Sequence, residues 1–152
     1  IDRLTHPFDA RLTGWHTYKQ LDIEFAGDLA SNFNRHIEKN YRNSWTFNVG
    51  AEYRVTDRFD ARLGMLIDTT PVRKTHYNPE TPGMTKIEPT IGLSFRPVKN
   101  VSIDASLLYV AGLGANNAEC TYKDMITQQP VVFKADYKLH AFCPAIGVNL
   151  NF

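Results

Sequence analysis

The segment SWTFNVGAEYRVTDRFDARLGMLID, residues 44–68, alternates between apolar and polar side chains, and only Leu66 interrupts the pattern. Side chains two residues apart lie on one face of a β-strand, so the segment predicts two strands joined by a turn near Asp57. Each strand then has an apolar face and a face of polar residues and glycine, which is typical of a transmembrane β-barrel. The apolar set is Trp45, Phe47, Val49, Ala51, Tyr53, Val55, Phe59, Ala61, Leu63, Met65 and Ile67.

The same alternation predicts four further strands. Residues 86–97, 101–111 and 142–152 each have one apolar face, although the end of the second of these is apolar on both faces. Residues 11–25 form a less regular strand, because the apolar residues Leu12 and Trp15 would lie on opposite faces of a regular strand. We expect a bulge or kink at Thr13 and Gly14, where this strand changes register.

Short and long connections alternate along these six strands. Residues 55–59 and 97–101 are tight turns, whereas 27–43, 69–85 and 112–132 are long and polar. This alternation favours an all-β fold, an antiparallel up-and-down transmembrane barrel with short periplasmic turns and long extracellular loops. The C-terminus is then periplasmic. Aromatic residues expected near the two membrane boundaries are Phe59, Phe95 and Phe152 at the periplasmic rim, and Trp15, Trp45 and Tyr109 on the outer half.

A soluble antiparallel sandwich is the alternative, because its strands also alternate. Soluble strands average only about 5–6 residues, and those predicted here are longer. The mean hydropathy is −0.34, and no apolar run approaches the roughly 20 residues of a spanning helix. A net charge of +1, with both signs interspersed, gives no indication of nucleic-acid binding.

Neither the start of the chain nor its cysteines indicate a cofactor. Because the chain begins at Ile1, we expect a mature or truncated product whose export signal lies upstream. Cys120, in a predicted loop, and Cys143, in a predicted strand, have neither CxxC spacing nor clustered histidines, so no zinc or other metal site is predicted. A disulfide between them and two free thiols both remain open.

Four segments are distinctive: TGWHTYKQLDIEF at 13–25, KNYRNSWTFNVGAEYRV at 39–55, RFDARLGMLIDTTPV at 58–72 and NPETPG at 78–83. They resemble the C-terminal part of the FadL/TodX (OMPP1) outer-membrane transporters. The resemblance implies a fourteen-stranded barrel with an N-terminal plug. Barrels have at least about 8 strands, so residues 1–152 are expected to be the C-terminal portion of one barrel domain, without its plug and earlier strands. It also implies passive transport of long-chain fatty acids or other hydrophobic compounds.

Charged residues on the polar face are predicted to point into the lumen near the periplasmic halves of their strands. They can form a cross-strand charge ladder that fixes the plug, or a polar track for a solute. The set comprises Glu52, Arg54, Asp60, Arg62, Glu88, Arg96 and Asp104.

Two groups are candidates for substrate binding. Basic residues before the first hairpin lie where the family places a cation near the bound carboxylate, and a charge-assisted bond could hold the headgroup there. The alternative is that they belong to an ordinary solvent-exposed loop. Inward apolar residues on the outer halves of their strands could line a pocket or pack against an infolded loop. The basic residues are Arg35, Lys39 and Arg42, and the apolar ones are Leu66, Leu108 and Val110.

No enzyme is predicted, because the five histidines are scattered without a nucleophile and base at matching positions. The last strand, with Val148, Leu150 and Phe152 on its apolar face, resembles the C-terminal signal read by the barrel-assembly machinery. The expected partners are therefore outer-membrane lipid, a hydrophobic ligand and that machinery. The alternative function is a barrel scaffold or binding protein within a larger secretion or cell-surface assembly.

Overall fold

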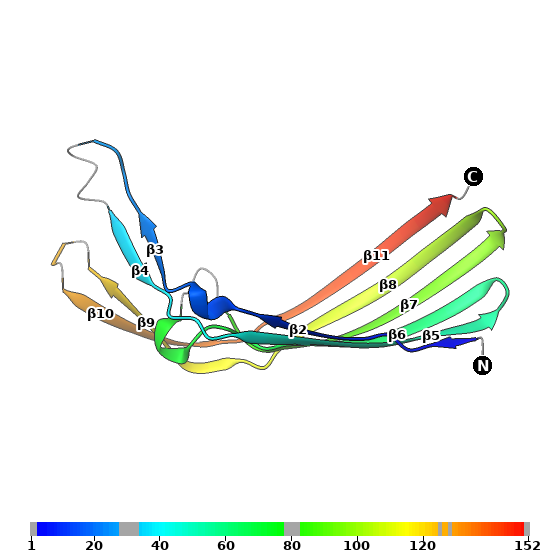
Figure 1. Cartoon of the computed structure of the whole chain (residues 1–152), viewed down its shortest axis with the longest axis horizontal. Helices are drawn as coiled ribbons and strands as arrows, with labels where there is room; N and C mark the ends of the chain where they lie inside the picture. The colour runs from blue at the N-terminus through cyan, green and yellow to red at the C-terminus, as the bar shows by residue number, and fades with distance from the viewer. Residues whose placement is uncertain (1–2, 28–33, 78–82, 125, 128, 151–152) are drawn as a thin grey trace.

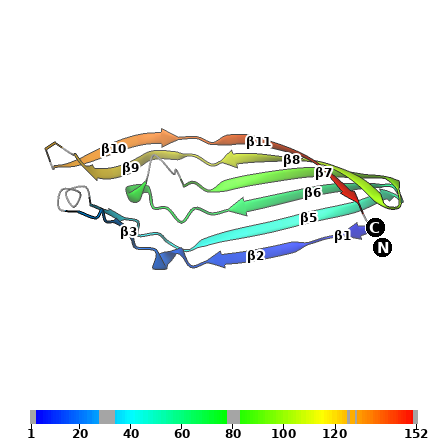
Figure 2. The ribbon, with the colours of Figure 1, turned by 90° about the horizontal axis from the view of Figure 1, so that it is seen from above.

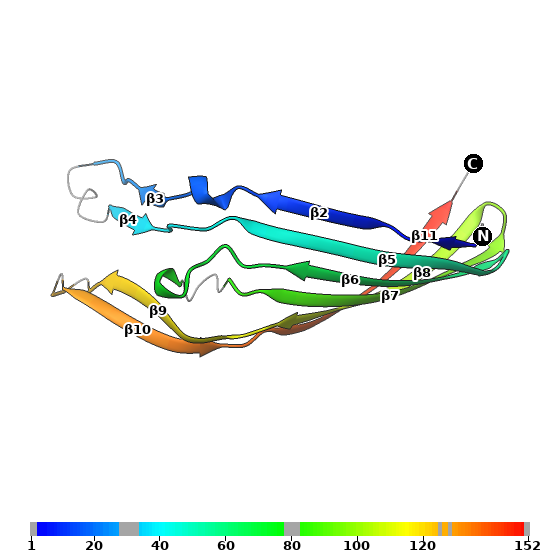
Figure 3. The ribbon, with the colours of Figure 1, turned by 60° about the horizontal axis from the view of Figure 1, so that its bottom comes forward.

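The computed structural model of the protein describes residues 3–27, 34–77, 83–124, 126–127 and 129–150. Its main element is one antiparallel sheet that curves like part of a cylinder (Figures 1 and 3). Two short strands lie end to end along the first long one, and the order continues β5-β6-β7-β8-β11. The strands are β1 (Leu4–Thr5), β2 (Phe8–Thr13), β5 (Ser44–Thr56), β6 (Phe59–Asp68), β7 (Lys86–Val98), β8 (Val101–Gly112) and β11 (His140–Leu150).

Two hairpins project beyond one end of the sheet, away from the marked chain termini (Figure 2). One pairs β3 (Gln20–Ile23) with β4 (Arg35–Glu38), and the other pairs β9 (Ala115–Lys123) with β10 (Pro130–Tyr137). We call this the long-loop end, and the opposite end, with the β5–β6 and β7–β8 turns, the turn end. Two 3-10 turns, η1 (Trp15–Thr17) and η3 (Lys74–His76), also lie at the long-loop end.

The two faces of the sheet differ as the alternation predicts. Leu63 is 64% exposed on the convex face, in register with Ala51 and Ile91. On the concave face Asp60 is 2% exposed, in register with Arg54 and Ser94. The convex face is therefore an apolar outer wall and the concave face a polar inner one, which confirms the predicted barrel architecture. The barrel is not closed by these strands, because β1/β2 and β11 form the two edges of the sheet.

The predicted strand over residues 11–25 is wrong beyond Thr13. The wall strand instead starts earlier, where Phe8 and Leu12 register with Val49 and Trp45 on the outer face. It ends at Thr13, and η1 follows. Gln20–Ile23 then leaves the wall and pairs with β4, so the change of parity marks the end of a strand rather than a bulge.

Two predicted loops also contain strands. Residues 27–43 include β4, and residues 112–132 include β9 and the start of β10. Cys120 therefore lies in a strand, in register with Phe133, and both Cys120 and Cys143 are free thiols. The last wall strand begins two residues earlier than expected, and Phe152 lies outside the described residues.

A small apolar cluster joins the β9–β10 hairpin to the connection between β6 and β7. Val72 and Tyr77 pack there with Ala115 and Ala118, and Tyr137 lies against the cluster. The rings of Tyr77 and Tyr137 are 4.7 Å apart between centroids. Within the part of the chain that the structure describes, no helix has the length and apolar character needed to cross a bilayer.

The exposed Leu63 provides a test of the outer face. We expect Leu63→Arg to lower the free energy of unfolding of the full-length barrel by about 2–4 kcal/mol, because an arginine near the bilayer midplane loses its hydration. Ser106→Arg, on the inner face of β8, is the matched control and should cost less than about 1 kcal/mol. Urea unfolding in phospholipid vesicles measures both, and equal losses would contradict the assignment of the faces.

Candidate functional site

A chain of hydrogen bonds crosses five adjacent strands on the inner face. Arg62 donates through Nε to Glu52 Oε2 at 2.5 Å and through Nη1 to Ser94 Oγ at 2.5 Å. Ser94 in turn donates to Asp104, which also accepts a bond of 2.6 Å from Asn149 Nδ2. These hydrogen bonds thus connect β5, β6, β7, β8 and β11, and they fix the five strands relative to one another.

A second ion-pair group lies nearer the turn end. The buried Asp60 carboxylate accepts two bonds from Arg96, at 2.6 Å from Nη1 and 2.9 Å from Nη2, while Arg54 Nε is 3.7 Å away. Two parallel guanidinium bonds give the carboxylate a fixed geometry. The two groups together hold three acidic and three basic residues. We therefore describe this part of the inner wall, with Glu52, Arg54, Asp60, Arg62, Arg96 and Asp104, as the neutral network.

Glu88 does not belong to the neutral network, although the sequence placed it there. It registers with Leu66, and its carboxylate lies 3.5 Å from Lys86 Nζ, which also pairs with Asp68 at 3.1 Å. This group lies at the long-loop ends of β6 and β7. Sequence reasoning missed Lys86, yet the pairing of residues 68 and 86 across a predicted antiparallel pair would have indicated it.

The inner face between these charged groups is formed mainly by small residues. Gly50 registers with Gly64, and Gly64 with Thr90. Thr90 registers with Leu108 of β8. Leu66 is the next inward residue of β6 after Gly64, and it registers with Asn48 of β5 and Glu88 of β7. Val110 registers with Ala141 at the end of β11. The predicted apolar residues Leu66, Leu108 and Val110 are all half-buried on the inner face toward the long-loop end.

The three predicted basic residues occupy different settings. Arg35 lies in β4, in register with Ile23, and its side chain is not described. Lys39 is only 7% exposed, and its backbone N–H donates to Lys19 O at 2.7 Å. Arg42 is exposed, and its Nε donates to Thr70 O at 3.2 Å. The structure therefore does not present them as one binding site.

Polar contacts hold the β3–β4 hairpin together and link it to η3. Asp22 pairs with His36 Nδ1 at 2.5 Å, and bonds from Gln20 and then His36 hold the pKa of the Asp22 carboxyl below its usual value. His76 Nε2 lies 4.0 Å from Glu38 and 3.4 Å from Asn40 Nδ2. Among the described residues, no three His, Cys, Asp or Glu side chains lie where they could share a metal ion.

The outer face of β11 is continuous and apolar. Val148 and Leu150 are exposed and register with Ile103 and Val101 of β8. Residues placed in this way contact lipid in a barrel wall.

An apolar outer face, a polar inner face and long connections at one end define a segment of the wall of an outer-membrane-type β-barrel. The chain belongs to the family of outer membrane protein transport proteins (OMPP1/FadL/TodX), whose pattern matches residues 1–152.

Two comparisons with individual proteins cover nearly all of this chain, and the second of them shows the same fold. The 47 kDa outer membrane protein of Pasteurella multocida (strain Pm70) is 26% identical over 151 residues, which cover 99% of this chain and 31% of that protein. The crystal structure of a Pseudomonas aeruginosa FadL homologue superposes with a TM-score of 0.81 at 22% identity, over 100% of this chain and 33% of the homologue. The chain therefore spans about a third of the length of these relatives.

Arg96 and Arg54 both contact Asp60, but their substitution should have different effects. Arg96→Gln removes both close bonds to a carboxylate that is almost fully buried, which is strongly destabilising. Arg54→Gln removes an exposed partner at 3.7 Å, a weak type of interaction. We expect the first to lower the urea midpoint at least about twice as much as the second. An equal shift in the two variants would argue against the bidentate pair.

Proposed function

We propose that this chain forms part of the wall of a passive outer-membrane transporter of hydrophobic or amphipathic small molecules, with long-chain fatty acids as the substrate class. Membership of the family supports transport. The division of the inner face supports a hydrophobic or amphipathic substrate, because a neutral, internally paired network occupies one half, while apolar residues lie toward the other. No catalytic step is proposed for this wall.

Lys39 carries the proposal most directly. Its side chain is almost fully covered, and it makes no ion pair or side-chain hydrogen bond with any residue the structure describes. The Lys39 ammonium keeps contact with solvent, because the Tyr77 hydroxyl is the one buried side-chain polar atom without a hydrogen-bond partner among the described residues. Its positive charge is therefore accessible to an anion from outside the chain. A carboxylate headgroup would supply that anion through charge-assisted bonds. Lys39 is thus the residue proposed to hold the headgroup.

Leu66, Leu108 and Val110 are proposed to contact the acyl chain. Leu66 follows Gly64 on the inner face of β6, and Leu108 registers with Thr90 of β7. Amphiphile sites combine an apolar surface with a few polar groups, and this combination would suit a fatty acid. The neutral network would close the opposite half of the wall and, in the complete barrel, contact the plug.

The orientation in the membrane belongs to the same proposal. The long-loop end, with both projecting hairpins, would be extracellular, and the turn end with the C-terminus would be periplasmic. The apolar outer face of β11, including Val148, Leu150 and the undescribed Phe152, would present the signal for the barrel-assembly machinery.

A scaffold role in a larger membrane complex is the second candidate. It is favoured by exposed apolar residues on both projecting hairpins, among them Ile23 and Phe133. Such residues mark sites of protein contact when they are contiguous. In that case uptake would not depend on the barrel.

Fatty-acid uptake tests the transport proposal. We expect Lys39→Gln in the full-length protein to raise the concentration of labelled oleate required for half-maximal uptake about tenfold, because one charge-assisted contact is lost. Lys39→Arg should retain most of the uptake.

Lys138→Gln is the matched control, because Lys138 is an exposed lysine at the same end of the sheet. It should transport as the parent does, and surface labelling should confirm equal amounts of each variant. If cells without the barrel take up oleate as fast as cells with it, the transport proposal fails. If uptake requires the barrel but Lys39→Gln behaves as the parent, only the headgroup assignment is wrong.

A further inference from the structure

A cavity of about 450 Å³ lies at the long-loop end, between the β6–β7 connection and the start of β9. Three basic side chains line it, contributed by Arg42, Arg73 and Lys74, together with Tyr77 and Leu113. We call this the basic pocket. Its volume is within the usual range for ligand sites, roughly 300–1,000 Å³.

The cations of the basic pocket have no acidic partners among the described residues. The Nε atoms of two of them hold the loop backbone, from Arg42 to Thr70 O at 3.2 Å and from Arg73 to Asn40 O at 2.8 Å. The Lys74 ammonium makes no hydrogen bond with any residue the structure describes. Three unpaired positive charges around one cavity favour an anionic ligand.

Tyr77 forms the buried inner wall of the basic pocket. It is 3% exposed, and its hydroxyl is the one buried side-chain polar atom in the described part of the chain without a hydrogen-bond partner. A buried hydroxyl without a partner is costly, and such atoms are rare in folded proteins. The hydroxyl has almost no accessible surface, so it lies behind the wall of the basic pocket, and Tyr77 contributes its ring to the lining.

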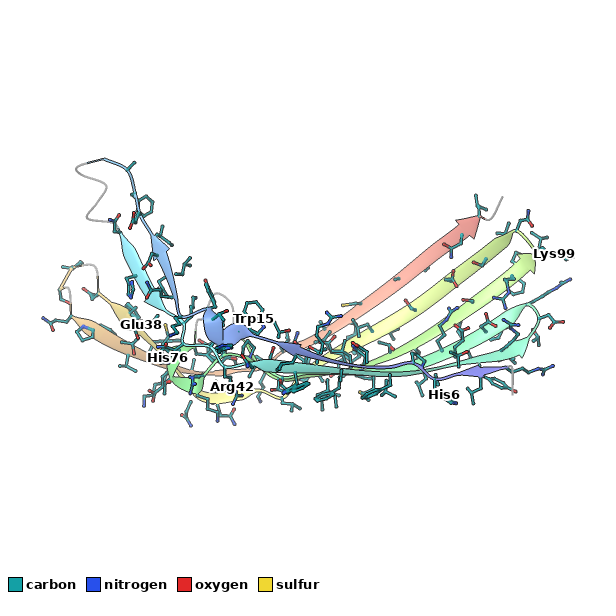
Figure 4. The ribbon with its side chains drawn as sticks, viewed as in Figure 1. His6, Trp15, Glu38, Arg42, His76 and Lys99 are labelled. Carbon is teal, nitrogen blue, oxygen red and sulfur yellow. The ribbon has the colours of Figure 1, made fainter. Side chains whose placement is uncertain are left out.

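The basic pocket lies at the apolar outer wall. Figure 4 shows Arg42 on the lower, convex side of the sheet, the side on which His6 also lies. Trp45 begins this apolar face, where its ring stacks on Phe47 with 5.7 Å between centroids. The β6–β7 connection is bonded to this point, because Thr69 N donates to Trp45 O at 2.9 Å. Leu113, which also lines the pocket, is 62% exposed.

We propose that the basic pocket binds the phosphorylated headgroup of a lipid in the leaflet at the long-loop end. Tryptophan at the margin of an apolar wall marks the depth of lipid headgroups. Cations immediately beyond it meet the lipid phosphates, which accept charge-assisted bonds from arginine and lysine. The exposed Leu113 would contact the upper part of the acyl chains. This site is distinct from the lumenal site proposed around Lys39 and does not depend on transport.

The test uses the full-length barrel and native mass spectrometry. The probes are bisphosphorylated lipid A, the same lipid after removal of its phosphates, and sodium phosphate. We expect Lys74→Gln to weaken binding of the phosphorylated lipid about tenfold, because it removes a charge-assisted contact. Tyr77→Phe, which retains the ring and removes only the covered hydroxyl, should bind the lipid as the parent does. Lys99→Gln is the control, because Lys99 is an exposed lysine at the turn end (Figure 4).

Equal binding of the dephosphorylated lipid would overturn the proposal. So would equal binding by the parent and Lys74→Gln, or the same loss in Lys99→Gln, which would indicate general charge attraction. If sodium phosphate occupies the site and lipid A does not displace it, the pocket binds a soluble anion and not a lipid. An unchanged urea midpoint for Lys74→Gln establishes that any loss of binding comes from the pocket.

Discussion

The need to pair every backbone N–H and C=O inside a bilayer is the constraint on which the structure depends. Lipid offers no hydrogen bonds, so a sheet can span it only when its strands pair laterally and the barrel closes. The long antiparallel registers of β5 to β8 and β11 meet this requirement along the wall. The strand period of two then assigns alternate side chains to lipid and to the lumen. Both the apolar outer face and the neutral network follow from this arrangement.

The neutral network explains how a charged inner face can be a stable wall. Asp60 is buried, but two bonds from Arg96 replace the water it has lost. The bonds from Glu52 through Arg62 and Ser94 to Asp104 run across the strands, so they add side-chain links to the backbone ladder. Because these charges compensate one another, that half of the inner face has little attraction for an ion. Under the proposed function, an amphiphile would make its apolar and cationic contacts toward the long-loop end.

The parity of the side chains predicted the wall well, because lipid and lumen act on every strand residue. Side-chain parity was less successful at the long-loop end, where side chains no longer alternate between lipid and lumen. Leu12 and Trp15 have opposite parity because the strand stops at Thr13, whereas sequence alone also permits a bulge. The β3–β4 and β9–β10 hairpins project from the wall, so their strands have no uniform lipid face. As a result β4, β9 and the start of β10 were predicted as loops, and β3 was predicted as a continuation of the wall strand. Even so, their register pairs Cys120 with Phe133 and Leu21 with Ile37.

Candidate site residues on the wall strands could be predicted from the sequence, whereas those on the connections could not. Inward positions such as Arg62 and Leu108 could be assigned from parity, and so could Lys86, which was overlooked. Arg35, Lys39 and Arg42 are close in sequence but lie in different settings, because the chain leaves β4 and enters the wall between them. The basic pocket could not be predicted, since it combines Arg42 with residues from two other connections. Tyr77 is buried only because the β9–β10 hairpin packs against it.

The central claim is that the convex face of the sheet contacts lipid and the concave face a water-filled lumen. It is tested most directly in the full-length barrel, with Cys120 and Cys143 replaced by serine and a single fluorescent label attached at Leu63→Cys or Ser106→Cys. Brominated lipids should quench the label at position 63 and leave the label at position 106 unchanged, whereas aqueous iodide should do the reverse. Quenching of both labels by iodide, with neither affected by brominated lipid, would contradict the account.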